Sequence, residues 1–147
     1  MVDIFIHFCI RGNLNGIIDL INKNNINIHT HNEYGFRSAC ADGHTHIVEY
    51  LINLYKIRPS RYPIYAKINI HANNEEGFRG ACMNRHKHTI KYLINLHKIN
   101  PIYDKINIHV DNEYGFKKAC IHKHKYIIKY LLSCGCYSDN YKCIIIL

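Results

Sequence analysis

Asn-Glu-Tyr-Gly-Phe-Arg-Ser-Ala-Cys, at residues 32–40, is the first of three related stretches in this chain of 147 residues. The stretch returns with small changes at residues 74–82 and 112–120, and a histidine stands four residues after the cysteine of every copy. An apolar run that contains a tyrosine follows each time. A recurrence at this period is typical of one supersecondary unit stacked on copies of itself. The sequence therefore predicts a repeat architecture.

Each unit is predicted to be a pair of helices that follows a short extended arm. The arm sequence Ile-Asn-Ile-His occurs at residues 26–29, 68–71 and 106–109. Its alternation of apolar and polar residues is typical of extended backbone. Phe36, Ala39 and Cys40 are spaced to share one buried face of the first helix. Residues 44–54 carry an apolar stripe and form the predicted second helix, and Gly43 stands at the left-handed turn between the two helices.

The later copies keep these positions with few substitutions. The predicted structural core is Phe36, Ala39, Cys40, Phe78, Ala81, Cys82, Phe116, Ala119 and Cys120. Asn32 and its two counterparts stand where the chain must turn, and asparagine tolerates a positive φ better than most residues. Arg85 and Lys123 replace Gly43 in the later copies, which predicts either a different turn or a strained backbone there.

The whole chain is interpreted as a single domain of repeats. Residues 1–25 keep the cysteine, the glycine and the apolar spacing of the helix pair but lack the Asn-Glu-Tyr-Gly-Phe element, as expected of a degenerate terminal copy. The repeats are placed at residues 26–67, 68–105 and 106–135, and a C-terminal cap is placed at residues 136–147. The proline-bearing segments between repeats are predicted to be loops on one side of the stack.

Residues 39–52 read Ala-Cys-x-x-Gly-His-x-x-Ile-Val-x-x-Leu-Ile, which resembles the ankyrin repeat. The resemblance extends in weaker form over essentially the whole chain. It implies an all-α fold, an ankyrin-like solenoid of stacked helix-turn-helix repeats with short extended arms and long inter-repeat loops. The altered phrase around Asn32, the composition and the extended spacing resemble the ankyrin-like proteins of amoeba-infecting giant DNA viruses of the mimivirus kind.

The resemblance implies a non-enzymatic protein–protein interaction module, here a viral protein that binds a host protein. In the family, the turns and first helices line a concave side that partners contact. The residues expected to be exposed there are Glu33, Tyr34, Arg37, Glu75, Arg79, Glu113, Tyr114, Lys117 and Lys118. Tyrosine and arginine are common at interface hot spots. A second interpretation is that these residues only stabilise the turn, for example through an ion pair between Glu33 and Arg37 at i, i+4.

An alternative function is a repeat protein that binds nucleic acid through a basic face. The formal charge is +8, and residues 74–147 hold twelve Lys and Arg against six Asp and Glu. Tyrosines lie near these lysines in the sequence, as in many nucleic-acid-binding proteins. Against this function, the lysines at 87, 91, 125 and 129 fall on the outer stripe of the second helices, where a solvated face is the usual outcome.

Metal binding is suggested by Cys40 and His44 at i, i+4, a pair that recurs in the later copies. We interpret these cysteines as small core residues and the histidines as part of the turn, because the pairs lie in different repeats and a tetrahedral site needs four converging ligands. Cys134 and Cys136, together with Cys143, form a second candidate set that is no stronger. No metal and no cofactor is therefore expected.

The sequence contains no nucleophile elbow, phosphate loop or paired-carboxylate motif, so no catalytic residue, enzymatic activity or small-molecule substrate is expected. No secretory signal and no apolar run of membrane-spanning length is recognised. An intracellular protein that is not secreted is therefore expected, located in the host cytoplasm if viral, with no membrane partner. The seven cysteines are then expected to be reduced thiols.

Overall fold

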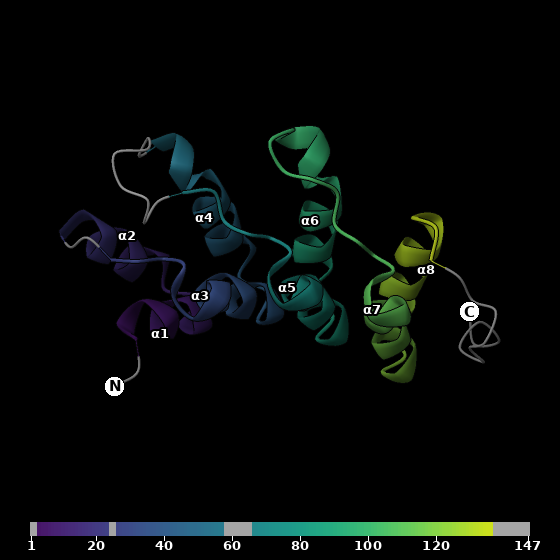
Figure 1. Ribbon diagram of the computed structural model, residues 1–147. Coiled ribbons are helices and arrows are strands. Elements are labelled where there is room, and N and C mark those ends of the chain that lie inside the picture. Colours follow the sequence, from purple (N-terminus) through teal and green to yellow (C-terminus); the bar gives the residue numbers. More distant parts are fainter. Residues whose placement is uncertain (1–2, 24–25, 58–65, 137–147) are drawn as a thin grey trace.

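The computed structural model describes residues 3–23, 26–57 and 66–136, and these residues form eight helices and no strand. The helices are α1 (Ile4–Arg11), α2 (Leu14–Lys23), α3 (Thr30–Ala41), α4 (Thr45–Ile57), α5 (Ala72–Met83), α6 (Lys87–Ile99), α7 (Val110–Ile121) and α8 (Lys125–Ser133). Consecutive helices pair as hairpins that stand side by side (Figure 1). The predicted all-α fold class is confirmed, whereas the ankyrin arrangement stays a prediction.

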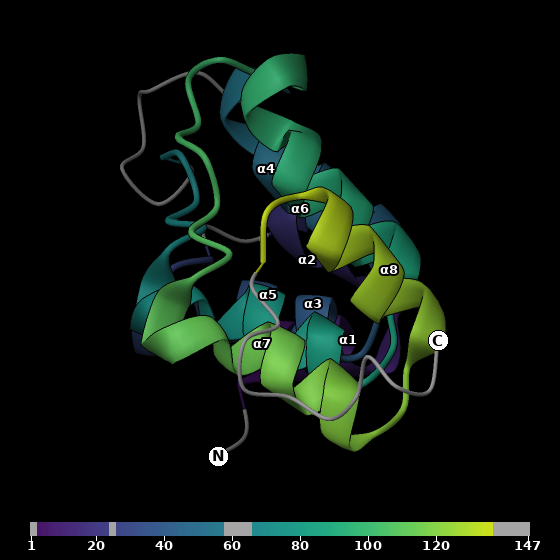
Figure 2. The same cartoon turned by 90° about the vertical axis from the view of Figure 1, so that its right-hand side faces the viewer.

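The first helices of the hairpins form one layer and the second helices form the other. Figure 2 shows α1, α3, α5 and α7 together below α2, α4, α6 and α8. The core lies between these layers and between neighbouring hairpins. All nine predicted core residues are buried, namely Phe36, Ala39, Cys40, Phe78, Ala81, Cys82, Phe116, Ala119 and Cys120. The i, i+3, i+4 spacing of Phe, Ala and Cys thus identified the packed face of the first helices correctly.

Small residues bring the first helices close together. A Cβ atom added to Gly77 would stand 3.2 Å from the Cβ of Cys40, and one added to Gly115 would stand 3.2 Å from the Sγ of Cys82. That separation is tighter than ordinary van der Waals contact. A glycine on one helix therefore receives the cysteine of the preceding first helix, which explains why both residues recur in every full copy.

Each arm enters its first helix through a left-handed turn of three residues. In α3 these are His31, Asn32 and Glu33, with φ of 51°, 55° and 62°. The same three positions are left-handed in α5 and α7. The prediction of a positive φ at the asparagine is confirmed, but its two neighbours were not expected to share it. Left-handed backbone costs about 1–2 kcal/mol per L-residue, so the turn needs compensating contacts.

The turn between the two helices of a hairpin is also left-handed. Gly12 and Gly43 have φ of 72° and 75°, while Arg85 and Lys123 hold the same conformation with φ of 68° and 57°. Of the two outcomes predicted for the glycine replacements, the strained backbone is therefore the one that occurs.

Two of the second helices, α4 and α6, extend about one turn beyond their predicted ends. α4 ends at Ile57 rather than Leu54, and α6 ends at Ile99, just before Asn100 and Pro101. Proline ends the α6 pattern because its ring cannot continue a helix. The loop prolines Pro59 and Pro63, residues 137–147 of the predicted cap and Cys143 lie outside the described residues. None of the described helices has the length and apolar character that crossing a membrane requires.

The strained turns predict that replacing a lysine with glycine changes the free energy of unfolding in opposite directions at two sites. Lys123→Gly should raise the free energy of unfolding by about 0.5–1 kcal/mol, because it relieves backbone strain that outweighs the added entropy of glycine in the unfolded chain. Lys129→Gly, at an exposed position inside α8, should lower it by about 1 kcal/mol. Urea unfolding followed by circular dichroism measures both. A loss of stability in both variants would contradict the account of the turn.

Candidate functional site

The nine residues predicted to face a partner fall into two groups. Glu33, Glu75 and Glu113 are only 5%, 4% and 8% exposed, and Arg37 is 6% exposed. The prediction that these four residues lie on the surface is wrong. The left-handed turn is the physical reason, because it points the glutamate back toward the arm instead of along a right-handed helix. Tyr34, Arg79, Tyr114, Lys117 and Lys118 keep partial or full exposure.

Each buried glutamate is hydrogen-bonded to the histidine four residues before it. The Nδ1 atom of His29 lies 2.8 Å from Oε1 of Glu33. The corresponding distances are 2.7 Å for His71 and Glu75, and 2.8 Å for His109 and Glu113. The ion pair predicted between Glu33 and Arg37 does not form, since each residue has a different partner.

The same glutamates join successive units. Oε1 of Glu33 accepts the backbone N–H of Asn69 at 3.1 Å, and Oε1 of Glu75 accepts that of Asn107 at 3.1 Å. Both asparagines lie in the arm of the following unit. One carboxylate oxygen thus holds its own arm through a histidine and the next arm through a backbone amide.

The asparagine of each arm continues this connection. Its side-chain oxygen accepts the N–H of the histidine two residues later, at 3.0 Å in the first and third arms and 3.1 Å in the second. That histidine then reaches the next glutamate. A continuous chain of hydrogen bonds therefore runs along the array from Asn27 to Glu113. We call it the carboxylate chain.

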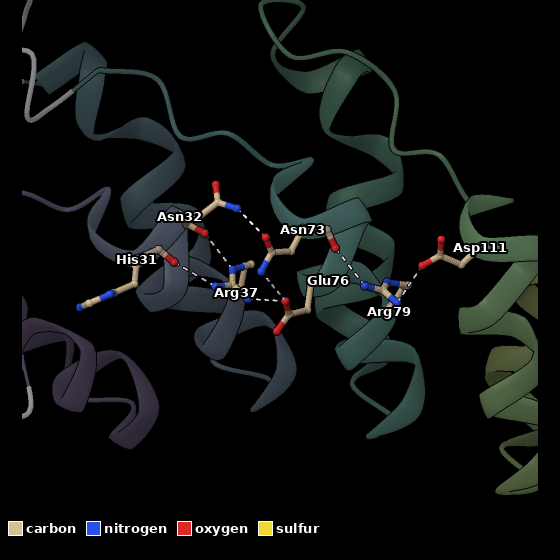
Figure 3. A network of polar contacts seen from close by, with 7 residues as sticks. All are labelled: His31, Asn32, Arg37, Asn73, Glu76, Arg79 and Asp111. Atoms are coloured by element: carbon tan, nitrogen blue, oxygen red, sulfur yellow. Dashed lines mark hydrogen bonds and ion pairs between the residues drawn. The ribbon is translucent and has the colours of Figure 1, made fainter.

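Arginines satisfy the carbonyl groups of the left-handed turns. Nε of Arg37 donates to the carbonyl of Asn32 at 2.8 Å, and Nη2 donates to that of His31 at 3.0 Å. Its Nη1 pairs with the carboxylate of Glu76 in the next unit. Figure 3 shows these contacts beside the equivalent arginine of α5. The turn-stabilising interpretation therefore describes the observed role of Arg37.

Arg79 repeats this arrangement at the next boundary. Nη2 of Arg79 donates to the carbonyl of Asn73 at 2.9 Å, and Nη1 lies 2.9 Å from Oδ2 of Asp111 (Figure 3). The sequence did not indicate that Glu76 and Asp111 pair with these arginines, because they lie 39 and 32 residues from them. The only available signal was that both are polar residues of the repeated turn.

The exposed part of these turns forms a polar and aromatic strip. Tyr34 is 41% exposed and has the guanidinium carbon of Arg37 5.2 Å from its ring centre. The ring of Tyr114 lies 5.1 Å from the guanidinium carbon of Arg79 and 5.2 Å from Nζ of Lys118. We define the turn surface as Tyr34, Tyr114, Lys117 and Lys118 together with the exposed turn residues His31, Asn32, Asn73, Asn74, Asp111 and Asn112.

The cysteine and the histidine of each repeated pair have different structural roles. Cys40 is fully buried, and burial raises the pKa of its thiol far above the ordinary value. The pKa of the equivalent Cys9 is raised to about 12, mainly by burial and also by Asp3. Nε2 of His44 instead donates to the carbonyl of Ile10 in the preceding hairpin at 2.9 Å. The thiols therefore belong to the core, and the ring serves the contact between hairpins.

Among the residues that the structure describes, one group brings together three side chains that can bind a metal. The ligand atoms of His109, Glu113 and Cys136 lie within 4.8 Å of one another. The candidate set predicted from the sequence joins Cys136 with Cys134 and Cys143 instead. His109 and Cys136 were not connected because they are far apart in the chain and belong to different segments.

The second helices carry a separate basic surface. Nζ of Lys91 lies 5.2 Å from the ring centre of Tyr126 and 5.5 Å from that of Tyr130, and Nζ of Lys87 lies 5.6 Å from that of Tyr126. A cavity of about 430 Å³ opens beside Lys87 and Tyr126, where Arg85 and two histidines also line it. We define the outer basic face as the exposed residues Arg85, Lys87, Lys91, Lys125, Tyr126 and Lys129.

Comparisons of the chain with protein-family models, with curated proteins and with solved structures found no match. The turn surface and the outer basic face offer hydrogen-bonding groups, aromatic rings and positive charge, a combination that suits recognition of another macromolecule.

The carboxylate chain predicts a strong dependence of stability on Glu75. Glu75→Ala should lower the free energy of unfolding by about 1–3 kcal/mol, because the N–H of Asn107 and the ring of His71 lose their acceptor. Glu75→Gln should cost less, since an acceptor oxygen remains. Glu49→Ala, on the exposed side of α4, should change stability by less than about 0.5 kcal/mol. Equal effects of Glu75→Ala and Glu49→Ala in urea unfolding would contradict the bridging role.

Proposed function

We propose that this protein is a non-enzymatic interaction module that binds a partner protein through the turn surface. The observation that carries the proposal is the pair of tyrosines held beside arginines on that surface. Tyr34 and Tyr114 each have a guanidinium carbon within 5.2 Å of the ring centre. Tyrosine offers large contact area for little loss of conformational freedom, and the arginines restrict the rings further.

The composition of the turn surface supports the same function. Four asparagines are exposed at its turns, namely Asn32, Asn73, Asn74 and Asn112. Asparagine with tyrosine is also the combination that binding loops of antibodies favour, because the amide adapts its hydrogen bonds while the ring supplies area. Lys117 and Lys118 add positive charge at one end, so a partner with acidic groups opposite α7 would fit best.

The turns are also held in place before any partner binds. Arg37 and Arg79 tie the turn carbonyls of their own unit and pair with an acidic residue of the next. A surface that is already ordered loses less entropy on association, which strengthens binding for a given contact area. The resemblance to giant-virus repeat proteins suggests a host protein as the partner.

Removal of aromatic and basic groups from the turn surface tests the proposal. Tyr114→Ala combined with Lys118→Glu should reduce the recovery of partner proteins by at least about tenfold, the effect of losing one interface hot spot. Recovery is measured by cross-linking and quantitative mass spectrometry with the full chain as bait. Circular dichroism should show an unchanged fold. Lys129→Glu on the outer basic face is the charge-matched control. Partners that the double variant retains and Lys129→Glu loses would contradict the turn surface as the site.

A second candidate function, binding of single-stranded nucleic acid, is favoured by the outer basic face. Tyr126 is 45% exposed and lies between two lysines. Bases can stack on such a ring while the lysines neutralise phosphates. The face also continues from α6 to α8, so more than one nucleotide could contact it.

This candidate predicts affinity that depends on both salt and the ring of Tyr126. An oligothymidine should bind the full chain with an affinity that falls steeply as salt rises, because bound lysines release counterions. Tyr126→Ala should lower the affinity about fivefold or more, since stacking contributes about 1–3 kcal/mol per base. Fluorescence anisotropy provides the measurement, and Lys118→Glu is the control. No binding at low salt would exclude this function for the outer basic face.

A further inference from the structure

The last glutamate of the carboxylate chain has a neighbour that the first two lack. Glu33 and Glu75 accept a backbone N–H from the arm of the following unit. Glu113 keeps the hydrogen bond to its histidine, but the thiol of Cys136 lies beside this pair. The third unit therefore places nitrogen, oxygen and sulfur donors together. In the described residues of the earlier units, no thiol forms such a group with the histidine and the glutamate.

We propose that His109, Glu113 and Cys136 form a binding site for a divalent transition metal, and that Zn²⁺ fits this donor set best. Imidazole, carboxylate and thiolate are the three ligand types that zinc uses in proteins. Mg²⁺ and Ca²⁺ prefer oxygen ligands throughout, so a thiol disfavours them.

The spacing of the donors suits such an ion after a small adjustment. The three ligand atoms lie within 4.8 Å of one another. Zinc bonds of about 2.0–2.3 Å in a tetrahedral site place ligand atoms about 3.6 Å apart. The 2.8 Å hydrogen bond between His109 and Glu113 would open, and the thiol would move closer.

Two of the three proposed ligands are buried, and the third is open to solvent. Glu113 and Cys136 are 8% and 5% exposed, so the polar atoms of the site are shielded from water on that side. The side chain of His109 is 45% exposed. It also lines a cavity of about 540 Å³, together with Tyr130 and Cys134. An ion can thus reach His109 from solvent, and water can supply the fourth ligand.

Binding requires a simple exchange of protons. The thiol of Cys136 loses its proton to solvent and coordinates as a thiolate, while Glu113 coordinates as a carboxylate. His109 coordinates through Nδ1, so its ring proton is carried on Nε2. Zinc is not oxidised or reduced, and no other reactant is needed.

The preceding unit provides an internal control for this assignment. His71 and Glu75 have nearly the same separation as His109 and Glu113, at 2.7 Å against 2.8 Å. The amide of Asn107 stands at Glu75, and an N–H group cannot act as a metal ligand. Only the pair beside Cys136 should therefore bind metal tightly.

Metal titration of the full chain under reducing conditions tests the site. Zn²⁺ competed against a chromophoric chelator should bind with one equivalent, and it should raise the melting temperature. Co²⁺ should give a thiolate-to-cobalt charge-transfer band. His109→Gln and Cys136→Ser should each weaken zinc binding by about a hundredfold, since even changes to the partners of metal ligands cost 10- to 100-fold. His71→Gln should bind as the unaltered chain does.

His109→Gln keeps the test decisive even if Cys136→Ser fails to fold, because His109 is exposed and the glutamine amide can still donate a hydrogen bond to Glu113. Circular dichroism should confirm that this variant is folded. Zinc binding that His109→Gln leaves unchanged, or a cobalt complex without the charge-transfer band, would overturn the assignment. Failure to bind one equivalent of zinc would overturn it as well.

Discussion

A buried carboxylate between successive units is the contact on which the rest of this structure depends. Glu33 and Glu75 must point inward to meet the backbone amides of Asn69 and Asn107. A glutamate at the start of a right-handed helix would point along the helix surface instead. The left-handed turn, the histidine of the arm and the arginine that caps the turn all serve to place this one oxygen atom.

The turn is unfavourable by itself, and most of the contacts that offset its cost come from the array. Three left-handed residues cost on the order of 3–6 kcal/mol per turn. The carbonyl bonds of Arg37, its pairing with Glu76 and the bridge from Glu33 offset this cost, but two of these three contacts need the next unit. A single helix pair would therefore keep the strain but only part of the compensation. Stacking and turn geometry are two aspects of the same interaction.

Sequence patterns predicted the parts of the fold that follow from local periodicity. Phe36 and Cys40 were assigned to the core because their spacing matches one helix face, and Asn32 was assigned to a turn by its tolerance of positive φ. The exposure of Glu33 was predicted wrongly because a charged residue beside a turn is normally solvated. One of its two partners, the amide of Asn69, lies 36 residues away. The group at Cys136 was missed for the same reason, since no local pattern connects it with His109.

The glycine–cysteine contacts between first helices have a consequence for how such a chain can change length. Gly77 against Cys40 and Gly115 against Cys82 fix the distance between neighbouring first helices. The repeat length nevertheless changes from 42 residues between Asn32 and Asn74 to 38 between Asn74 and Asn112. The difference lies in the sequence between α4 and α5, which is four residues longer than that between α6 and α7. The spacing of neighbouring first helices is thus set by these contacts, while the sequence that joins one hairpin to the next can change in length without changing that spacing.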